Sequence, residues 1–177
     1  PGVPDDFYAR LARLAGTRGS RLVLDTSGAP LDAALDTGVF LVKPNLRELS
    51  AHLGRELPDR PAQLAAVRQL VASGRCEAVA LSLGHRGALL ATRDGAWFAP
   101  PLSIQPRSAV GAGDSFVGGM VWALAQGQDW PDSLAWAVAC GTGALLSVST
   151  GLCRATDAIE LKEQVRLEPQ AWTPIDS

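Results

Sequence analysis

The sequence lacks the features that mark several large classes of protein. It has no cluster of lysine and arginine, and its 16 basic and 18 acidic residues give a net charge of −2. Because clustered basic side chains hold nucleic-acid backbones, we expect no nucleic-acid partner. The three cysteines, Cys76, Cys140 and Cys153, are an odd number at spacings that fit neither a zinc site nor a disulfide framework. Three buried thiols in a reducing compartment are the simplest interpretation, so we expect a cytoplasmic protein.

Long apolar runs are also missing. The most apolar run, residues 134–148, is too short to span a bilayer, so we expect a buried helix there and no membrane partner. Residues 1–6 have neither a basic region nor an apolar core, which excludes a signal peptide at this position. A composition of 47% hydrophobic and 19% charged residues is typical of globular soluble proteins. A chain of 177 residues can form one compact domain or part of a larger one.

Two common phosphate-binding motifs are absent as well. No Gly-x-x-x-x-Gly-Lys-Ser/Thr occurs, which excludes a P-loop. The glycine-rich segment 111–116 has Phe116 where a dinucleotide fingerprint needs its third glycine, so a nicotinamide site is not expected. His52 and His85 have no serine or cysteine partner in a nucleophile motif, and we interpret both as surface or capping residues.

The hydrophobic pattern alternates between helical and strand periods. Helices are expected over residues 7–19, 29–37, 46–53, 64–71, 115–125, 134–145 and 157–167, and strands over 21–25, 39–42, 78–83, 88–92 and 96–99. The last two strands flank Asp94-Gly95, a dipeptide typical of hairpins. This order predicts an α/β fold with a mostly parallel sheet and helices on both faces. Residues 1–167 would form this portion, and 168–177 an irregular tail.

Ligands of such sheets collect beyond the carboxyl ends of the strands. Polar residues occur at those ends, namely Asp25, Lys43, Asn45 and Ser82. Asn45 and Glu48 can face the same side of one helical turn, either as a capping box or as oxygen ligands that organise Mg²⁺. Gly84 and Gly87 follow Ser82, and they would serve either a tight turn or close backbone approach to a nucleotide.

The segment Ser108-Ala109-Val110-Gly111-Ala112-Gly113-Asp114-Ser115-Phe116 precedes an apolar helical run. Its small residues leave backbone N–H groups accessible at a helix N-terminus, where the macrodipole favours an anion such as phosphate. Asp114 has two interpretations. It is either an acid that stabilises the first turn of the helix or a group that takes part in chemistry.

Together these motifs resemble the ribokinase-like carbohydrate kinases, specifically the phosphofructokinase B branch. The most specific part is Val110–Ser115 followed by Gly118 and Gly119. Lys43–Leu49, the Ser82–Ala88 segment and Thr150–Cys153 occur in the family's order. The resemblance covers nearly the whole chain and implies the C-terminal, nucleotide-binding portion of a sugar kinase, with the sugar-binding N-terminal half of the fold missing.

The resemblance also implies roles for individual residues. Asp114 would be the base, and Gly111, Ala112 and Gly113 would form the anion hole. Asn45 and Glu48 would organise Mg²⁺ around the phosphates of ATP. The other residues expected around the nucleotide are Lys43, Ser82, Gly84, Gly87, Val138, Gly141 and Thr142. A monovalent cation, K⁺ in the family's manner, would use positions similar to Ser108, Val110, Ala144, Ser147 and Ser149.

The sequence departs from the family at some of these positions. Ala109 stands where the motif usually has threonine, and Ser147, Ser149 and Gly151 replace the residues expected of close phosphofructokinases at the cation site. The implied activity is ATP-dependent phosphorylation of a sugar phosphate, with fructose 6-phosphate as the first candidate and a homodimer as the full-length form. The alternatives are a catalytically incompetent nucleotide-binding fragment, or a kinase of another sugar, of the fructose 1-phosphate-forming, tagatose 6-phosphate or ribose type.

Overall fold

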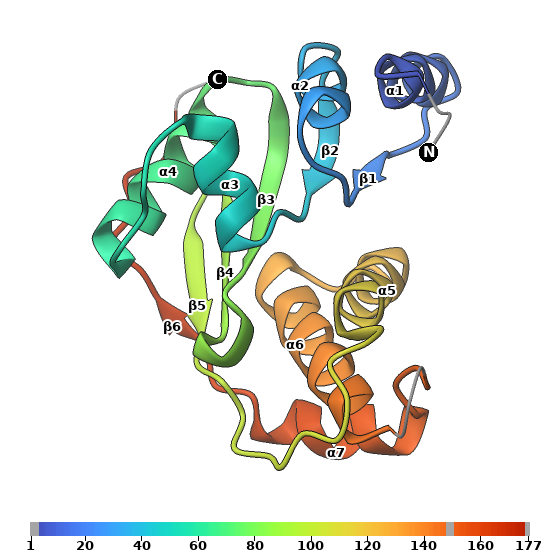
Figure 1. Cartoon of the computed structure of the whole chain (residues 1–177), viewed down its shortest axis with the longest axis vertical. Helices are drawn as coiled ribbons and strands as arrows, with labels where there is room; N and C mark the ends of the chain where they lie inside the picture. Colours follow the sequence, from blue (N-terminus) through green and yellow to red (C-terminus); the bar gives the residue numbers. More distant parts are fainter. Residues whose placement is uncertain (1–3, 148–150, 176–177) are drawn as a thin grey trace. The chain divides into compact units, whose positions relative to one another are not determined.

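The computed structural model describes residues 4–147 and 151–175 (Figure 1). Its helices are α1 (Phe7–Thr17), α2 (Ala29–Leu35), α3 (Leu46–Leu53), α4 (Arg60–Ala72), α5 (Ala112–Ala125), α6 (Trp130–Leu146) and α7 (Ala155–Gln164). Its strands are β1 (Val23–Leu24), β2 (Val39–Val42), β3 (Cys76–Ser82), β4 (Ala88–Thr92), β5 (Ala96–Ala99) and β6 (Glu168–Pro169). The predicted α/β class is confirmed, and most predicted boundaries lie within two residues of these.

The strands of the described residues form one sheet in the order β1-β2-β3-β4-β5-β6. β1 and β2 are parallel, with Val23 opposite Leu41, and β2 and β3 are parallel, with Val39 opposite Cys76. β5 and β6 are antiparallel. The sheet is therefore mixed, because the hairpin at Asp94-Gly95 and the C-terminal strand interrupt the parallel pattern that the first three strands establish.

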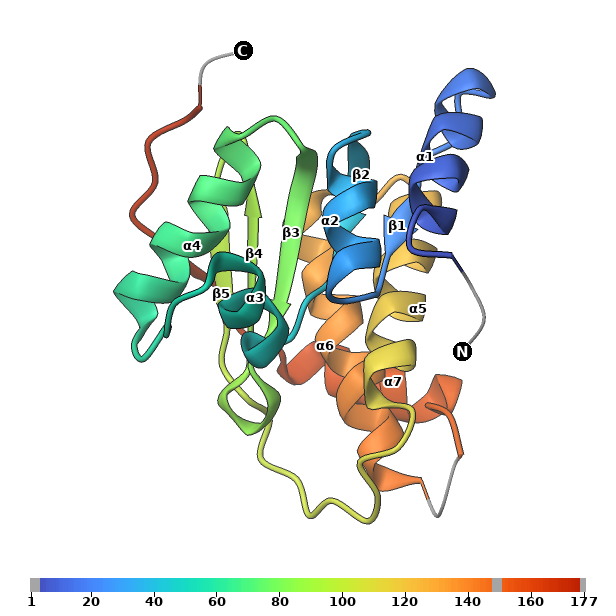
Figure 2. The same cartoon turned by 45° about the horizontal axis from the view of Figure 1, so that its top comes forward.

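Contacts divide the chain into two compact units. Unit 1 comprises residues 1–82, 89–96 and 171–177, and unit 2 comprises residues 83–88 and 97–170. In unit 1, α3 and α4 pack on β3, as both views show (Figures 1 and 2). The centre of this unit is fully buried and aliphatic, with Leu41, Val42, Leu49, Val67 and Val79 among its largest members.

Helix α4 buries most of the apolar face that its spacing predicts, whereas α1 buries a different one. In α4, Val67, Leu70 and Val71 are buried and Leu64 is half-buried, and the buried Gln63 amide donates to the carbonyl of Leu57 at 3.2 Å. In α1, Ala9 and Ala12 are buried, whereas Phe7 and Leu14 are exposed. Small side chains let α1 approach α2 closely, which places the larger apolar ones on the outside.

Unit 2 is built around the contact of α5 with α6, and α7 packs on α6. Asp129 caps α6 by accepting a hydrogen bond from the N–H of Asp132 at 2.8 Å, as N-cap aspartates do. Trp122 of α5 meets Trp136 of α6 edge to face with ring centroids 4.8 Å apart, and half of Trp122 stays exposed. Helix α5 begins at Ala112, three residues before the predicted start, so Asp114 lies inside its first turn.

The C-terminal residues are more ordered than a wholly irregular tail. Glu168 and Pro169 form β6, and the later residues return to unit 1. There the indole N–H of Trp172 donates to the carbonyl of Arg93 at 3.2 Å, and the backbone N–H of Ile175 donates to the same carbonyl at 3.0 Å. Among the described residues, no helix combines the length and apolar character needed to span a membrane.

Candidate functional site

The start of α5 is the first candidate feature. Gly111 occupies the N-cap position with φ 80°, a left-handed conformation that glycine adopts without strain, and no side chain caps the helix. The first hydrogen bond of the helix runs from the N–H of Ser115 to the carbonyl of Gly111 at 2.9 Å. Amides in the first turn of a helix have no acceptor within it, and here they are flanked only by glycine and alanine. This helix start can therefore accept an anion through backbone N–H groups.

Asp114 is the third residue of α5, and both it and Gly113 are exposed within the described structure. A carboxylate in this position favours helix formation through the macrodipole. Its exposure also leaves its oxygens accessible to another molecule. Both interpretations agree with this placement, so a catalytic role for Asp114 remains a prediction.

The segment after α6 lies against the start of α5. A Cβ at Gly111 would come 3.4 Å from Leu152, and the hydroxyl of Ser147 donates to the carbonyl of Leu152 at 2.9 Å. The backbone N–H of Cys153 donates to Oγ of Ser115 at 3.5 Å. The structure thus brings part of the predicted Thr150–Cys153 motif beside the glycine segment, while Thr150 lies outside the described residues.

The residues predicted for a monovalent cation are brought together in part. The backbone N–H of Ser108 donates to the carbonyl of Leu145 at 3.3 Å, which places Ser108 beside the C-terminal end of α6, where Ala144 and Ser147 also lie. Oγ of Ser108 accepts from the N–H of Val110 at 3.2 Å. Ser149 lies outside the described residues. The structure supports the grouping of these loops and does not test whether they bind an ion.

Helix α6 carries the residues predicted near adenine. Val138 and Gly141 are buried, and Thr142 is half-buried. A Cβ at Gly141 would lie 3.2 Å from Cβ of Phe116 and 3.3 Å from the carbonyl oxygen of Ala112. Gly141 therefore has a packing role, because it lets α6 approach the first turn of α5. Contact of these residues with a nucleotide remains a prediction.

In unit 1, the predicted residues gather at the carboxyl ends of three neighbouring strands. Nζ of Lys43 lies 3.1 Å from Oδ2 of Asp25, across the ends of β1 and β2. The side chain of Lys43 is 7% exposed and that of Asp25 is 34% exposed, so the charges form a partly buried ion pair. The sequence predicts both residues at strand ends but not their pairing, because no local spacing connects residues 25 and 43. Ser82 and Asn45 form a parallel bridge at the same edge.

Asn45 and Glu48 form the capping box that was one of the two interpretations. Oδ1 of Asn45 accepts from the N–H of Glu48 at 2.9 Å, and Oε2 of Glu48 accepts from the N–H of Asn45 at 2.8 Å. Among the described residues, no three His, Cys, Asp or Glu side chains form a group that could hold a metal. One carboxylate with a neighbouring amide still fits Mg²⁺, which usually keeps several waters and takes further oxygens from phosphates.

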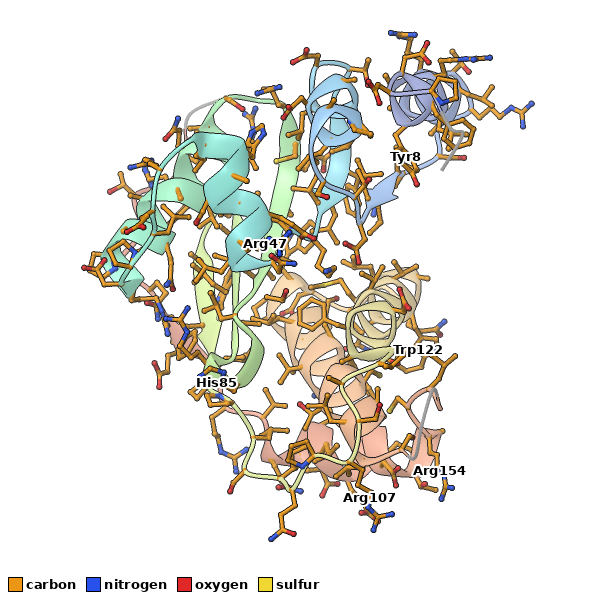
Figure 3. The ribbon with its side chains drawn as sticks, viewed as in Figure 1. Tyr8, Arg47, His85, Arg107, Trp122 and Arg154 are labelled. Atoms are coloured by element: carbon orange, nitrogen blue, oxygen red, sulfur yellow. The ribbon has the colours of Figure 1, made fainter. Side chains whose placement is uncertain are left out.

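Gly84 and Gly87 have a structural reason for being glycine. Both have positive φ, 60° and 96°, and they bracket a 3₁₀ turn that contains His85 (Figure 3). A Cβ at Gly87 would lie 2.1 Å from the carbonyl oxygen of Ala99, a distance that no side chain can tolerate. The turn interpretation thus accounts for Gly87, and a nucleotide contact there is untested. His52, in the last turn of α3, pairs with Asp32, and its side chain is 9% exposed, so the surface interpretation of His52 is wrong.

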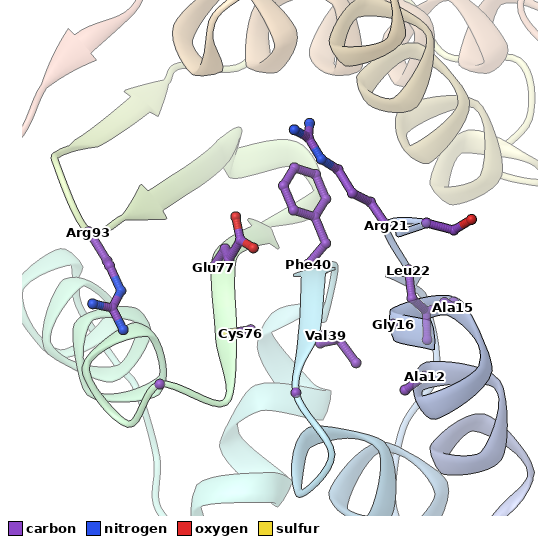
Figure 4. Close-up of a pocket in the computed structure, with 13 residues that line it drawn as sticks. Ala12, Ala15, Gly16, Arg21, Leu22, Val39, Phe40, Cys76, Glu77 and Arg93 are labelled. Atoms are coloured by element: carbon purple, nitrogen blue, oxygen red, sulfur yellow. The ribbon is translucent and has the colours of Figure 1, made fainter. Parts of the chain in front are cut away.

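A cavity of about 270 Å³ lies elsewhere in unit 1, at the amino ends of β2 and β3 (Figure 4). Its lining includes Arg21, Phe40, Glu77 and Arg93, and the guanidinium carbon of Arg21 lies 4.7 Å from the centre of the Phe40 ring. None of the predicted site residues lines this cavity. The predicted residues of unit 1 occupy the opposite ends of the strands.

Comparison with known proteins agrees with this set of motifs. The pfkB family of carbohydrate kinases matches residues 1–157. An ATP-dependent 6-phosphofructokinase isozyme 2 of Mycobacterium tuberculosis is 37% identical over 181 aligned residues, which cover 99% of this chain and 53% of that protein. A 1-phosphofructokinase of Rhodobacter capsulatus is 42% identical over 144 residues, which cover 81% of this chain and 45% of that protein.

A solved structure shows the same likeness in three dimensions. The crystal structure of phosphofructokinase-2 from Escherichia coli in complex with potassium superposes with a TM-score of 0.88 at 36% identity, over 93% of this chain and 53% of that one. The chain thus spans about half the length of the curated relatives that it matches. With its ribokinase-like fold, its Val110–Ser115 helix start and a family match over residues 1–157, this chain belongs to the pfkB family of carbohydrate kinases.

Proposed function

We propose that the protein to which this chain belongs transfers the γ-phosphoryl group of ATP to a hydroxyl of a sugar phosphate. The observation that carries the proposal is the Val110–Ser115 motif, which begins a helix without a side-chain cap in a chain of the pfkB family. The first candidate substrate is fructose 6-phosphate, with fructose 1,6-bisphosphate as product. A relative that is named 6-phosphofructokinase and aligns with 99% of this chain supports that choice.

The start of α5 would supply the base and the charge stabilisation. Asp114 would accept the proton of the attacking hydroxyl as the new O–P bond forms. The amides of Gly111, Ala112 and Gly113 would meet the negative charge on the transferring phosphoryl oxygens, and groups fixed in advance for such charge lower the barrier most effectively. Phosphoryl transfer asks a protein mainly for positioning and electrostatic stabilisation, which a rigid helix start can provide.

Unit 1 would supply groups for the metal and the nucleotide. Mg²⁺, when bound, neutralises charge on the phosphates, and Asn45 with Glu48 would orient it or its waters. The ammonium of Lys43, already held by Asp25, would attract phosphate oxygens. The remaining residues proposed to contact the nucleotide are Ser82, Gly84, Gly87, Val138, Gly141 and Thr142.

A monovalent cation site beside the start of α5 is part of the proposal. Hydroxyl and carbonyl oxygens would come from Ser108, Val110, Ala144, Ser147 and Ser149. The E. coli relative crystallised in complex with potassium supports K⁺ as the ion. We test it by comparing turnover in potassium, sodium and tetramethylammonium chloride at equal ionic strength, where equal rates in all three would exclude a specific site.

The decisive experiment is a screen for ADP release over fructose 6-phosphate, fructose 1-phosphate, tagatose 6-phosphate and ribose. It is performed on the 177-residue chain and on the full product of its gene. Release that depends on one sugar phosphate and disappears in Asp114→Asn would establish the function. The 1-phosphofructokinase relatives make fructose 1-phosphate a necessary arm of the screen.

A nucleotide-binding role without catalysis is the alternative. It would appear as saturable ATP binding by calorimetry with no sugar-dependent ADP release from either protein. We expect the active form to be a homodimer, which light scattering on a sizing column measures directly. If the proteins show no ATP binding and no ADP release, both functions are rejected.

A further inference from the structure

Two of the three thiols, those of Cys140 and Cys153, lie close to each other and to α5. Cys140 lies on α6, and Cys153 lies in the segment that joins α6 to α7, both within unit 2. The two thiols lie close enough for each to affect the pKa of the other, and both residues are half-buried. The Cys153 thiol donates to the carbonyl of Arg154 at 3.3 Å. Thirteen positions separate them in the sequence, so the contact is made by the fold and not by local spacing.

Each sulfur is accommodated by a glycine. A Cβ at Gly119 of α5 would lie 2.8 Å from Sγ of Cys140, and a Cβ at Gly143 of α6 would lie 2.5 Å from Sγ of Cys153. Real Cβ atoms do not approach other atoms so closely. These two positions therefore hold glycine where the thiols need room, and the two sulfurs occupy a space that the helices leave for them.

The segment carrying Cys153 also contacts the candidate site. The backbone N–H of Cys153 donates to Oγ of Ser115, the residue after Asp114, and Leu152 lies beside Gly111. A covalent bond between Cys153 and α6 would consequently fix this segment against the first turn of α5.

We propose that Cys140 and Cys153 are a modification site that closes into a reversible intramolecular disulfide. The co-reactant is a small-molecule disulfide such as oxidised glutathione. One protein thiolate attacks the reagent and releases one reduced thiol, leaving a mixed disulfide. The second protein thiol loses its proton, attacks the protein sulfur of that mixed disulfide and releases the second reduced thiol. The protein loses two electrons and two protons, and the reagent gains both.

The surroundings of the pair set the speed of the first step. The pKa of Cys140 is raised, mainly by burial. The pKa of Cys153 is raised to about 11 by burial first, and then by Cys140 and by the carboxylate of Asp157 on α7. Both groups are therefore thiols near neutral pH, and the thiolate is the attacking species. The thiolate fraction rises about tenfold per pH unit below the pKa, so closure should accelerate by that factor between neutral and mildly alkaline pH.

The second step does not depend on a collision. Once one sulfur carries the reagent, its partner already lies near it in the same unit, and such intramolecular reactions have high effective concentrations. Mixed disulfides should therefore be short-lived at this pair. They should persist at any cysteine without a neighbouring thiol.

Cys76 provides the matched control within the same chain. It is buried in β3 of unit 1, and burial raises its pKa to about 12. The protein is treated with oxidised glutathione at a series of pH values, quenched with acid, unfolded and labelled with a maleimide. We expect one labelled thiol, at Cys76, and an intact mass lower by two hydrogens, with peptide mapping that joins residues 140 and 153.

Variants make the test specific. Cys140→Ser and Cys153→Ser should each lose closure and accumulate a glutathione adduct on the remaining member of the pair, whereas Cys76→Ser should close at the unchanged rate. Circular dichroism of each reduced variant confirms that it is folded. Three labelled thiols after treatment, a bond that includes Cys76, or covalent dimers in place of the internal bond would overturn the proposal. Because mass is the readout, the result does not depend on kinase activity.

Discussion

Asn45 and Glu48 cap each other at the start of α3, each accepting a hydrogen bond from the backbone N–H of the other, at 2.9 and 2.8 Å. A capping box of this kind fixes the rotamers of both side chains. The proposed function uses this pair, held in advance by the cap, a second time, with its oxygens directed at a hydrated cation. The two interpretations made from the sequence are compatible, and variants can separate them.

Glu48→Gln should keep the cap and weaken the response to Mg²⁺. Glutamine retains an oxygen that can accept from the N–H of Asn45, so the melting temperature should change little. A neutral amide holds a hard cation or its waters less well than a carboxylate does, so half-saturation in a magnesium titration of activity or ATP binding should move to higher concentration. Asn45→Ala is the control for the cap, and it should cost about 1 kcal/mol of stability. Equal magnesium responses in Glu48→Gln and the unmodified protein would leave Glu48 with a capping role alone.

The motifs of this site could be identified from the sequence because each is local. The Asn45/Glu48 spacing, the hairpin at Asp94-Gly95 and the glycine segment before α5 all act within a few residues. The ion pair of Lys43 with Asp25 was not predicted, because the register of β1 against β2 creates it. The early start of α5 was also not predicted, since the two glycines at positions 111 and 113 have a low helix propensity. Here Gly111 serves as the N-cap and Gly113 lies in the first turn.

Asp114→Asn tests the chemical role of the exposed carboxylate at the start of α5. An amide cannot take a proton from a sugar hydroxyl, so ADP release by the full gene product should fall to background while ATP affinity and fold persist. If Asp114 only stabilises the first turn, the variant should keep its turnover and lose about 0.3–1 kcal/mol of stability. Measuring turnover and melting temperature on the same preparation distinguishes these outcomes.

Asp25→Asn should destabilise the protein through Lys43. The Lys43 side chain is 7% exposed, and the substitution removes the carboxylate that lies 3.1 Å from its ammonium. Leaving a buried charge without its ionic partner costs about 1–3 kcal/mol, and the partial exposure of Asp25 argues for the lower part of that range. Urea unfolding measures the loss.

The pair Arg75–Asp36 is a matched control, since Asp36 is 72% exposed and the contact is at the surface. Asp36→Asn should change the unfolding free energy by less than about 0.5 kcal/mol. A loss of the same size in both variants would contradict the assignment of a buried role to Lys43–Asp25.

Contacts between helices show a second limit of sequence reasoning. The segment 134–148 was correctly expected to include a buried helix, and α6 extends over Trp130–Leu146. Which glycine faces which neighbour could not be predicted, because the rotation of α5 against α6 depends on both helices at once. Gly118 and Gly119 are adjacent in the family motif, yet only Gly119 is buried. The contact of Cys140 with Cys153 escaped prediction for the same reason.

Alanine at these two adjacent positions should have opposite effects on stability. At Gly119, a Cβ would lie 2.7 Å from the carbonyl oxygen of Trp136 and 2.8 Å from Sγ of Cys140, so α5 and α6 would have to separate. Overpacking of this kind costs about 1–3 kcal/mol. At Gly118, a Cβ would meet nothing within 4 Å, and replacing glycine inside a helix by alanine should stabilise by about 0.5–1 kcal/mol. Urea denaturation of Gly118→Ala and Gly119→Ala with a common slope measures both changes, and a midpoint for Gly119→Ala that rises with that of Gly118→Ala would show that the helices do not meet at Gly119.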